Sequence, residues 1–156
     1  MRENSQEGYE ILKCISYDNG ESWSDIYTTP MDCGHRPVSG FLNDVRIMIT
    51  YRFIPFGTQN LFAAFFPGEA LLDTGRKDHM VRIMPLGYDR NSSPDLGYTG
   101  WVQFDDVQIY VVNYIKDDSD MAQIRDYSFY PDDIILHGTG TGTMHVFLQV
   151  PNFPKY

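Results

Sequence analysis

The sequence is poor in positive charge and has no long hydrophobic run. Lys and Arg number 12 against 21 Asp and Glu, which gives a formal net charge of -9. Nucleic acids and anionic membranes are bound by clustered positive charge, so this balance argues against both kinds of partner. The longest apolar stretch, residues 61–66, is far shorter than the roughly 18 residues that cross a membrane.

Cysteine and metal-ligand patterns are equally sparse. The sequence has two cysteines, Cys14 and Cys33. We expect them to be buried free thiols and not a bridge across a hairpin, because no secretory context accompanies them. The histidines show no close pair for zinc, and the acidic run 117–120 lacks the later Gly and Glu of a calcium loop. The sequence therefore predicts no metal site and no cofactor.

Helical periodicity is also scarce, and short strand-like runs take its place. Aromatic residues make up 15% of the chain, and turn residues separate apolar runs of four to eight residues. This pattern predicts an all-β sandwich, barrel or propeller over residues 1–137. A Gly/Thr-rich linker and a tail strand follow in residues 138–156. The expected strands are 11–16, 25–28, 38–42, 46–52, 60–66, 80–85, 99–104, 108–113, 123–129, 132–136 and 144–150.

An internal repeat narrows this choice of fold. Residues 39–41 (Ser-Gly-Phe) precede an acidic turn and the apolar strand 44–49, and residues 99–101 (Thr-Gly-Trp) precede a similar turn and strand at 106–111. The offset is 60 at the first element and 62 at the second. Such self-similarity is typical of stacked repeats. Eleven strands at about four per blade make fewer than three blades, so the chain cannot close a propeller alone.

One turn carries a recognisable motif. Residues 16–23 fit the spacing S-x-D-x-G-x-x-W. We expect Asp18 to accept backbone N–H groups across the turn, Gly20 to supply a positive φ angle, and Trp23 to bury its ring beneath. The motif resembles the Asp-box, or BNR repeat, of the sialidase superfamily, where it is structural. Asp18 is therefore predicted to be a fold signature and not a catalytic acid.

The resemblance extends along the chain. Residues 34–42 with 46–52, and 93–102 with 108–114, are similar to sialidase segments that enter the inner strand of a blade. It covers roughly residues 11–136. The resemblance implies four-stranded antiparallel propeller blades, of which this chain supplies an incomplete set of about two and a half.

The resemblance also implies a site. Sialidases cleave terminal acidic sugars with a tyrosine nucleophile, and three arginines bind the substrate carboxylate. Tyr98 falls on the nucleophile position, and Arg36 falls near the first arginine, although Arg-Pro here lacks the usual intervening residue. Arg76 and Arg90, together with Arg82, are the further candidates for carboxylate binding. The acid/base residue stays open among Asp73, Asp78, Asp89 and Asp95.

Two functions from different classes follow from these observations. The first is a glycoside hydrolase acting on a terminal acidic sugar through Tyr98. The second is a non-catalytic glycan-binding or assembly module that keeps the fold but lacks the acid/base set. For the individual residues, a packed aromatic at Tyr98 and arginines paired with surface carboxylates stay open as structural alternatives. In both cases Arg36 and Tyr98 enter corresponding strands and are expected to face one cavity. Uncovered sheet faces predict a homodimer of about six blades, or a missing companion segment that completes the propeller.

Overall fold

The structure, a computed structural model, describes Met1, residues 10–74 and residues 81–134. Within these residues it contains only strands and two short 3₁₀ helices, so the fold is all-β with antiparallel sheets. The elements in chain order are β1 (Leu12–Lys13), β2 (Tyr27–Thr28), β3 (Gly34–Phe41), β4 (Ile47–Phe53), β5 (Asn60–Phe66), η1 (Gly68–Leu71), β6 (Arg82–Tyr88), β7 (Leu96–Gln103), β8 (Ile109–Ile115), β9 (Gln123–Phe129) and η2 (Pro131–Ile134).

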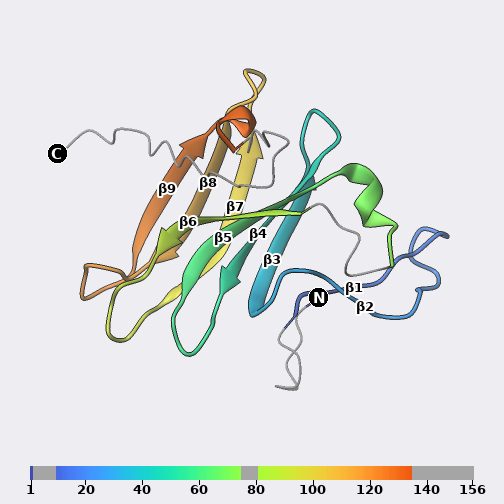
Figure 1. Ribbon diagram of the computed structural model, residues 1–156. Coiled ribbons are helices and arrows are strands. Elements are labelled where there is room, and N and C mark those ends of the chain that lie inside the picture. Colours follow the sequence, from blue (N-terminus) through green and yellow to red (C-terminus); the bar gives the residue numbers. More distant parts are fainter. Residues whose placement is uncertain (2–9, 75–80, 135–156) are drawn as a thin grey trace, which may run out of the picture.

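The strands form three sheets. The largest has the order β3-β4-β5-β6, the next β7-β8-β9, and β1 pairs with β2 in a small hairpin. Every pairing is antiparallel between strands that follow each other in sequence. Figure 1 shows the hairpin at one side of the four-stranded sheet and the three-stranded sheet at the other. The described part of the chain does not close into a ring.

The main core lies between the two larger sheets. Burial alternates along β8, so that the side chains on one face of the strand are buried. They meet the facing side of the four-stranded sheet. The buried residues of this core are Leu42, Met48, Leu61, Ala63, Phe65, Leu96, Ile109, Val111, Ile115 and Phe129.

A second core lies on the opposite face of the four-stranded sheet. Ile11 and Met31, which flank the small hairpin, pack there against Tyr51 and Phe66. Strands β4 and β5 are therefore covered on both faces, which explains their nearly continuous apolar sequence.

The predicted repeat is present, with a different alignment. Gly34 pairs with Phe53, and Leu96 pairs with Ile115, so both strands of the second pair are displaced by 62 residues. Each hairpin has a β-bulge at the same place, between His35 and Val38 and between Gly97 and Gly100. The predicted alignment of Gly40 with Gly100, at an offset of 60, is wrong. Both hairpins have the bulge at equivalent positions, so the offset between their residues is 62 along both strands. We call β3-β4-β5-η1-β6 the first repeat and β7-β8-β9-η2 the described part of the second.

The two hairpin turns also correspond. Val45 and Val107 both have a φ of 64°. The Asp44 carboxylate accepts the amide of Arg46, and Asp106 accepts that of Gln108 in the same way. A β-branched residue at positive φ is strained. Both turns therefore have Val at a position where glycine would adopt the same positive φ without strain.

Most predicted strands are confirmed, β5 and β9 with their predicted bounds. The strand predicted at 132–136 is wrong, because Pro131–Ile134 forms a 3₁₀ helix. Proline at its start and two aspartates in its first turn favour a helical turn over a strand. The strand predicted at 144–150 and the tail 138–156 lie outside the described residues.

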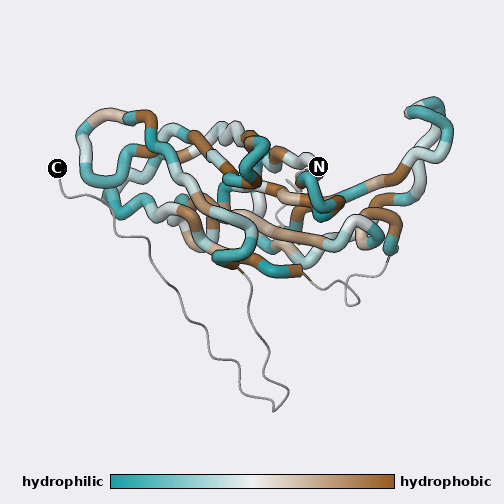
Figure 2. The backbone as a smooth tube through the Cα atoms, turned by 90° about the horizontal axis from the view of Figure 1, so that it is seen from above, coloured by the Kyte–Doolittle hydropathy of each residue, from teal (hydrophilic) through white to brown (hydrophobic). Residues whose placement is uncertain are grey.

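Residues 16–23, with the spacing S-x-D-x-G-x-x-W that predicts an Asp-box, lie between the paired strands β1 and β2. Asp18 accepts the amide of Ser22 at 2.9 Å and the hydroxyl of Ser16 at 2.8 Å, and Gly20 has a φ of 93°. The predicted burial of Trp23 is wrong, since the residue is 61% exposed. Figure 2 shows this hairpin extending away from the two larger sheets, and Trp23 lines an apolar cavity between the hairpin and β3 without being buried in it.

Both cysteines are free thiols, as expected, but each is half-buried and not fully buried. In the part of the chain that the structure describes, no helix is long and apolar enough to cross a membrane. The same residues contain no cluster of three or more His, Cys, Asp or Glu side chains that could hold a metal ion.

Candidate functional site

Arg36 and Tyr98 occupy the same position in the two repeats. Each lies inside the β-bulge of the first strand of its repeat, and each has a positive φ, 52° for Arg36 and 41° for Tyr98. A bulge inserts an extra residue and redirects its side chain out of the normal alternation. Backbone strain of this kind is held by the surrounding sheet and is often found at functional sites.

The two side chains touch each other. The guanidinium carbon of Arg36 lies 4.1 Å from the centroid of the Tyr98 ring, which is a cation–π contact. Tyr98 is 68% exposed, so the ring remains open to solvent on much of its surface. The Nη1 atom of Arg36 is buried and has no hydrogen-bond partner among the described residues. A buried donor without an acceptor is energetically costly.

Gly97 makes room for this contact. A Cβ atom at Gly97 would lie 2.7 Å from Nη1 of Arg36 and 3.1 Å from the hydroxyl of Tyr114. Any side chain there would displace the guanidinium. In the sequence Gly97-Tyr98, the glycine leaves space for the Arg36 guanidinium and the tyrosine supplies the exposed ring that it contacts.

Tyr114 links the site to a carboxylate. Its ring centroid lies 6.1 Å from that of Tyr98, and its hydroxyl donates to Oδ1 of Asp95 at 3.1 Å. Asp95 was one of four possible acids, and the structure places it one contact away from Tyr98. The site therefore runs from Arg36 past the rings of Tyr98 and Tyr114 to the carboxylate of Asp95.

Arg52 is a site residue that the sequence analysis did not select. It lies opposite His35 in the strand register, and Tyr114 lies opposite Gly97, so Arg52 and Tyr114 are also repeat equivalents. Its Nη1 donates to the carbonyl of Leu96 at 2.8 Å and to Oε1 of Gln59 at 3.1 Å. Arg52 thus joins the two sheets directly beside Gly97. The offset of 62 found for the second strand of each repeat already makes Arg52 equivalent to Tyr114, but the contact of Arg52 with Leu96 is visible only in the structure.

The remaining predicted arginines lie elsewhere or outside the described residues. Arg90 forms a bidentate ion pair with Asp117, with distances of 2.7 and 2.8 Å, and its described contacts do not include Arg36 or Tyr98. Arg125 binds the same carboxylate. The hydrogen bonds from Arg90 hold the pKa of Asp117 well below its usual range. Arg82 begins the outer strand β6, and Arg76 lies outside the described residues.

Two of the other possible acids have different surroundings. Asp89 is buried, and its carboxylate accepts backbone amides from residues 91, 95, 116 and 117, so it orders two loops. The backbone carbonyl of Asp73 accepts from the Lys13 ammonium. Asp78 lies outside the described residues. Of the four, Asp95 alone is bonded to a residue of the site within the described chain.

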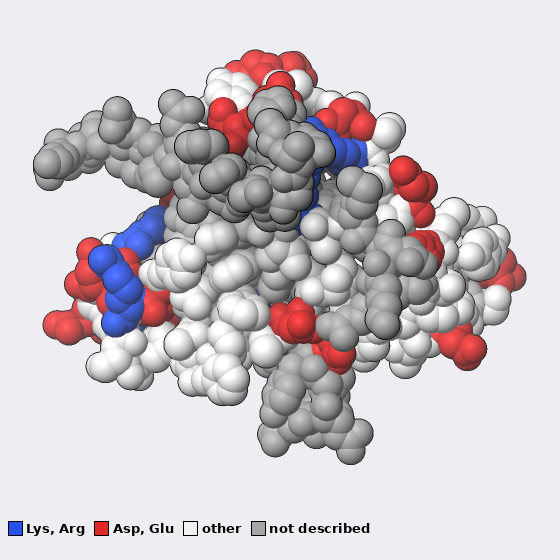
Figure 3. Space-filling view, in the orientation of Figure 1, with Lys and Arg blue, Asp and Glu red and all other residues white. Residues whose placement is uncertain are grey.

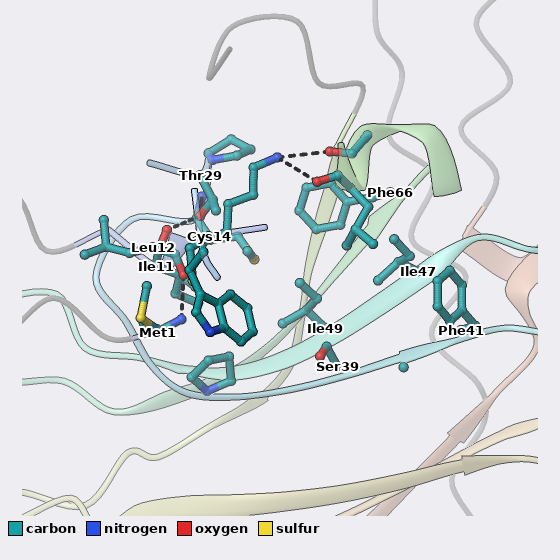
Figure 4. A pocket seen from close by; sticks show the side chains of 18 residues that line it. Met1, Ile11, Leu12, Cys14, Thr29, Ser39, Phe41, Ile47, Ile49 and Phe66 are labelled. Carbon is teal, nitrogen blue, oxygen red and sulfur yellow. Dashed lines mark hydrogen bonds between the residues drawn. The ribbon is translucent and has the colours of Figure 1, made fainter. Parts of the chain in front are cut away.

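A larger, apolar cavity lies apart from this polar site. It has a volume of about 870 Å³ and lies between the small hairpin and the outer face of β3 and β4. Figure 4 shows Ile11, Leu12 and Cys14 on one side and Ser39, Ile47 and Ile49 on the other. Neither Arg36 nor Tyr98 lines it. This cavity can hold apolar groups but offers no catalytic pair.

The surface seen in Figure 3 carries many acidic side chains and few basic ones. Against that background Arg36 offers a cation with an unpartnered donor, next to an exposed ring and a carboxylate. Such a set can bind a carboxylate in one plane and stack an apolar ring face beside it. Comparison with protein-family models, curated proteins and solved structures found no match for this chain.

Proposed function

We propose that this chain supplies blades of a sialidase-like propeller and binds the carboxylate of a terminal acidic sugar between Arg36 and Tyr98. The observation that carries the proposal is the buried, unpartnered Nη1 of Arg36 beside the exposed ring of Tyr98. A buried guanidinium nitrogen without an acceptor is costly, and a ligand carboxylate would satisfy it. The open ring face suits the C–H face of a sugar.

The arrangement of the two repeats supports the propeller. Antiparallel sheets of consecutive strands stack face to face, and β3 and β7, the first strands of the repeats, are neighbours. In a propeller the first strands surround the central axis. The bulged residues Arg36 and Tyr98 lie on these two strands, so the ligand would bind at the axis. The small hairpin β1–β2 would be half of a preceding blade.

The second candidate function is hydrolysis of the same sugar, and the exposed phenol of Tyr98 favours it. In this reaction the Tyr98 oxygen bonds to the anomeric carbon as the glycosidic C–O bond breaks. An acid protonates the leaving oxygen, a base takes the phenol proton, and water then cleaves the tyrosyl bond. We assign Asp95 as the candidate acid or base, because it accepts a hydrogen bond from Tyr114, whose ring lies beside that of Tyr98.

We also propose that a second copy covers the open faces. Phe41 is 67% exposed at the rim of the apolar cavity, and the described strands leave the stack of sheets open at both ends. Exposed apolar faces and strand edges drive association. Two copies around a two-fold axis would bring about six blades together. A companion segment that completes the propeller is the alternative.

Titration calorimetry with N-acetylneuraminic acid tests the proposed binding. The wild-type protein should bind the free acid at least about 10-fold more tightly than the carboxyl methyl ester, because a charged hydrogen bond contributes about 1.5–3 kcal/mol. Arg36→Lys should lose a similar factor, since an ammonium cannot form the planar pair. Equal affinity for acid and ester, or an unchanged Arg36→Lys variant, would contradict the proposal.

Tyr98→Phe separates the two candidate functions. This variant keeps the ring under Arg36 but removes the hydroxyl. We expect its affinity to stay within about threefold of the wild type in either case. If the protein hydrolyses a 4-methylumbelliferyl sialoside, the same variant should lose that activity. Activity that survives in Tyr98→Phe would exclude Tyr98 as the nucleophile, whereas a wild-type protein that binds the sugar without hydrolysing the sialoside would leave only the binding function.

A further inference from the structure

We propose that residues 145–151 of this chain dock as a fourth strand along the free edge of β9. The first repeat shows what the second lacks: β5 is paired on both edges, with β4 and β6, whereas among the described residues β9 pairs only with β8. An unpaired edge presents a row of backbone donors and acceptors that accept another strand. This inference does not depend on the ligand proposed above.

A groove accompanies the free edge. A cavity of about 470 Å³ lies between β6 and β9, lined by Leu86, Gly87 and Tyr88 on one side and by Asp126 and Tyr127 on the other. Gly87 and Tyr127 meet closely, since a Cβ atom at Gly87 would lie 2.2 Å from the Tyr127 hydroxyl. The groove is therefore bounded by the outer strand of the first repeat and by the strand that lacks a partner. A strand added to β9 would face β6 across it.

The repeat identifies the segment that fits. β9 corresponds to β5 with an offset of 63, as do the two 3₁₀ helices that follow, Gly68–Leu71 and Pro131–Ile134. The next element of the first repeat is β6, Arg82–Tyr88. The same offset places its counterpart at residues 145–151, with the sequence His-Val-Phe-Leu-Gln-Val-Pro. This stretch is rich in β-branched and aromatic residues, as strands are.

The register of the added strand follows from the same correspondence. In the first repeat Phe65 pairs with Arg82 and Ala63 with Met84. Displaced by 63 residues, these pairs become Ser128 with His145 and Asp126 with Phe147. The proposal therefore fixes which residues are opposite each other. A slip of one residue would turn every side chain to the other face.

Disulfide trapping tests this register in the full-length chain. The two native thiols are first removed with Cys14→Ser and Cys33→Ser. In that background Ser128→Cys with His145→Cys should form an intramolecular disulfide under mild oxidation, because opposite Cβ atoms in antiparallel strands lie about 4.5–5.5 Å apart. The control, Ser128→Cys with Val146→Cys, should form it at least about 10-fold more slowly.

Two outcomes would overturn the proposal. Equal or faster oxidation of the control pair would show a different register or no docking, and a disulfide between two molecules would show that the strand comes from a second copy. Hydrogen exchange of the unmodified protein gives an independent measurement. The amides of β9 should exchange as slowly as those of β5, whereas exchange typical of an open edge strand would contradict docking.

Discussion

The guanidinium carbon of Arg36 lies 4.1 Å from the centroid of the Tyr98 ring, and the two residues occupy equivalent bulges in successive repeats. Equivalent residues of the two repeats of one chain therefore contact each other where the two larger sheets stack. Gly97 and Tyr114 pack against the same guanidinium region, so the contact is shaped by its neighbours and not by the pair alone.

Gly97→Ala should disturb the site without unfolding the protein. The added Cβ would lie 2.7 Å from Nη1 of Arg36, which is the flexible end of a side chain and can move. We expect a change of less than about 1 kcal/mol in the free energy of unfolding, and a loss of about 10-fold in affinity for N-acetylneuraminic acid. Gly100→Ala is the control, because its Cβ would meet only a methyl group at 3.9 Å. An unchanged affinity in Gly97→Ala would argue against the site.

Val107→Gly should stabilise the protein. Val107 has a φ of 64°, which glycine adopts freely and a β-branched residue does not. Relief of this strain is expected to raise the free energy of unfolding by about 0.5–1 kcal/mol in urea denaturation, after the entropy cost of glycine is included. Val102→Gly, within strand β7, should instead lower it. If Val107→Gly lowered the free energy of unfolding as much as Val102→Gly does, the conclusion that Val107 is strained would be contradicted.

The Asp-box turn should weaken only in strong acid. Hydrogen bonds from Ser22, and then from Ser16, lower the pKa of Asp18 to about 2. Because the folded pKa lies below the unfolded value of about 3.9, the contribution of Asp18 to stability is complete above that value and is lost as the pH falls toward 2. Carboxyl NMR shifts of Asp18 should titrate with a midpoint near 2. A midpoint near the unfolded value would show that these hydrogen bonds are absent in solution.

Light scattering should report a dimer. The open stack of sheets and the exposed Phe41 support association at low micromolar concentration. Phe41→Glu, which places a charge at the rim of the apolar cavity, should shift the equilibrium toward the monomer. A well-folded wild-type monomer of 18.0 kDa would contradict the second copy.

Local patterns were enough to predict the class of fold. Alternating apolar residues and turn residues located β5 and β9 with their observed bounds. They failed at Pro131–Ile134, where the apolar run predicted a strand but the preceding Pro-Asp-Asp favours the 3₁₀ helix that the structure has. They also failed for Trp23, because burial depends on what packs against the hairpin, and no motif encodes that.

The site was predicted in part. The repeat indicated that Arg36 and Tyr98 enter corresponding strands, and the structure brings them into contact. Arg52 was missed although the offset of 62 in the second strand of each hairpin makes it equivalent to Tyr114, because its hydrogen bond to Leu96 joins two sheets and the repeat does not encode that contact. A bulge changes the count of residues on one strand only, so it becomes visible when the pairing of both strands is known.

Arginine side-chain NMR tests the central claim most directly. In a spectrum of the Nε–Hε groups, addition of N-acetylneuraminic acid should shift the signal of Arg36, assigned with Arg36→Lys, in a saturable way. The carboxyl methyl ester should not shift the Arg36 signal. The signal of Arg90, whose Nε–H donates to Asp117, should shift with neither ligand. An Arg36 signal that responds equally to both ligands, or to neither, would contradict a carboxylate-binding site at Arg36 and Tyr98.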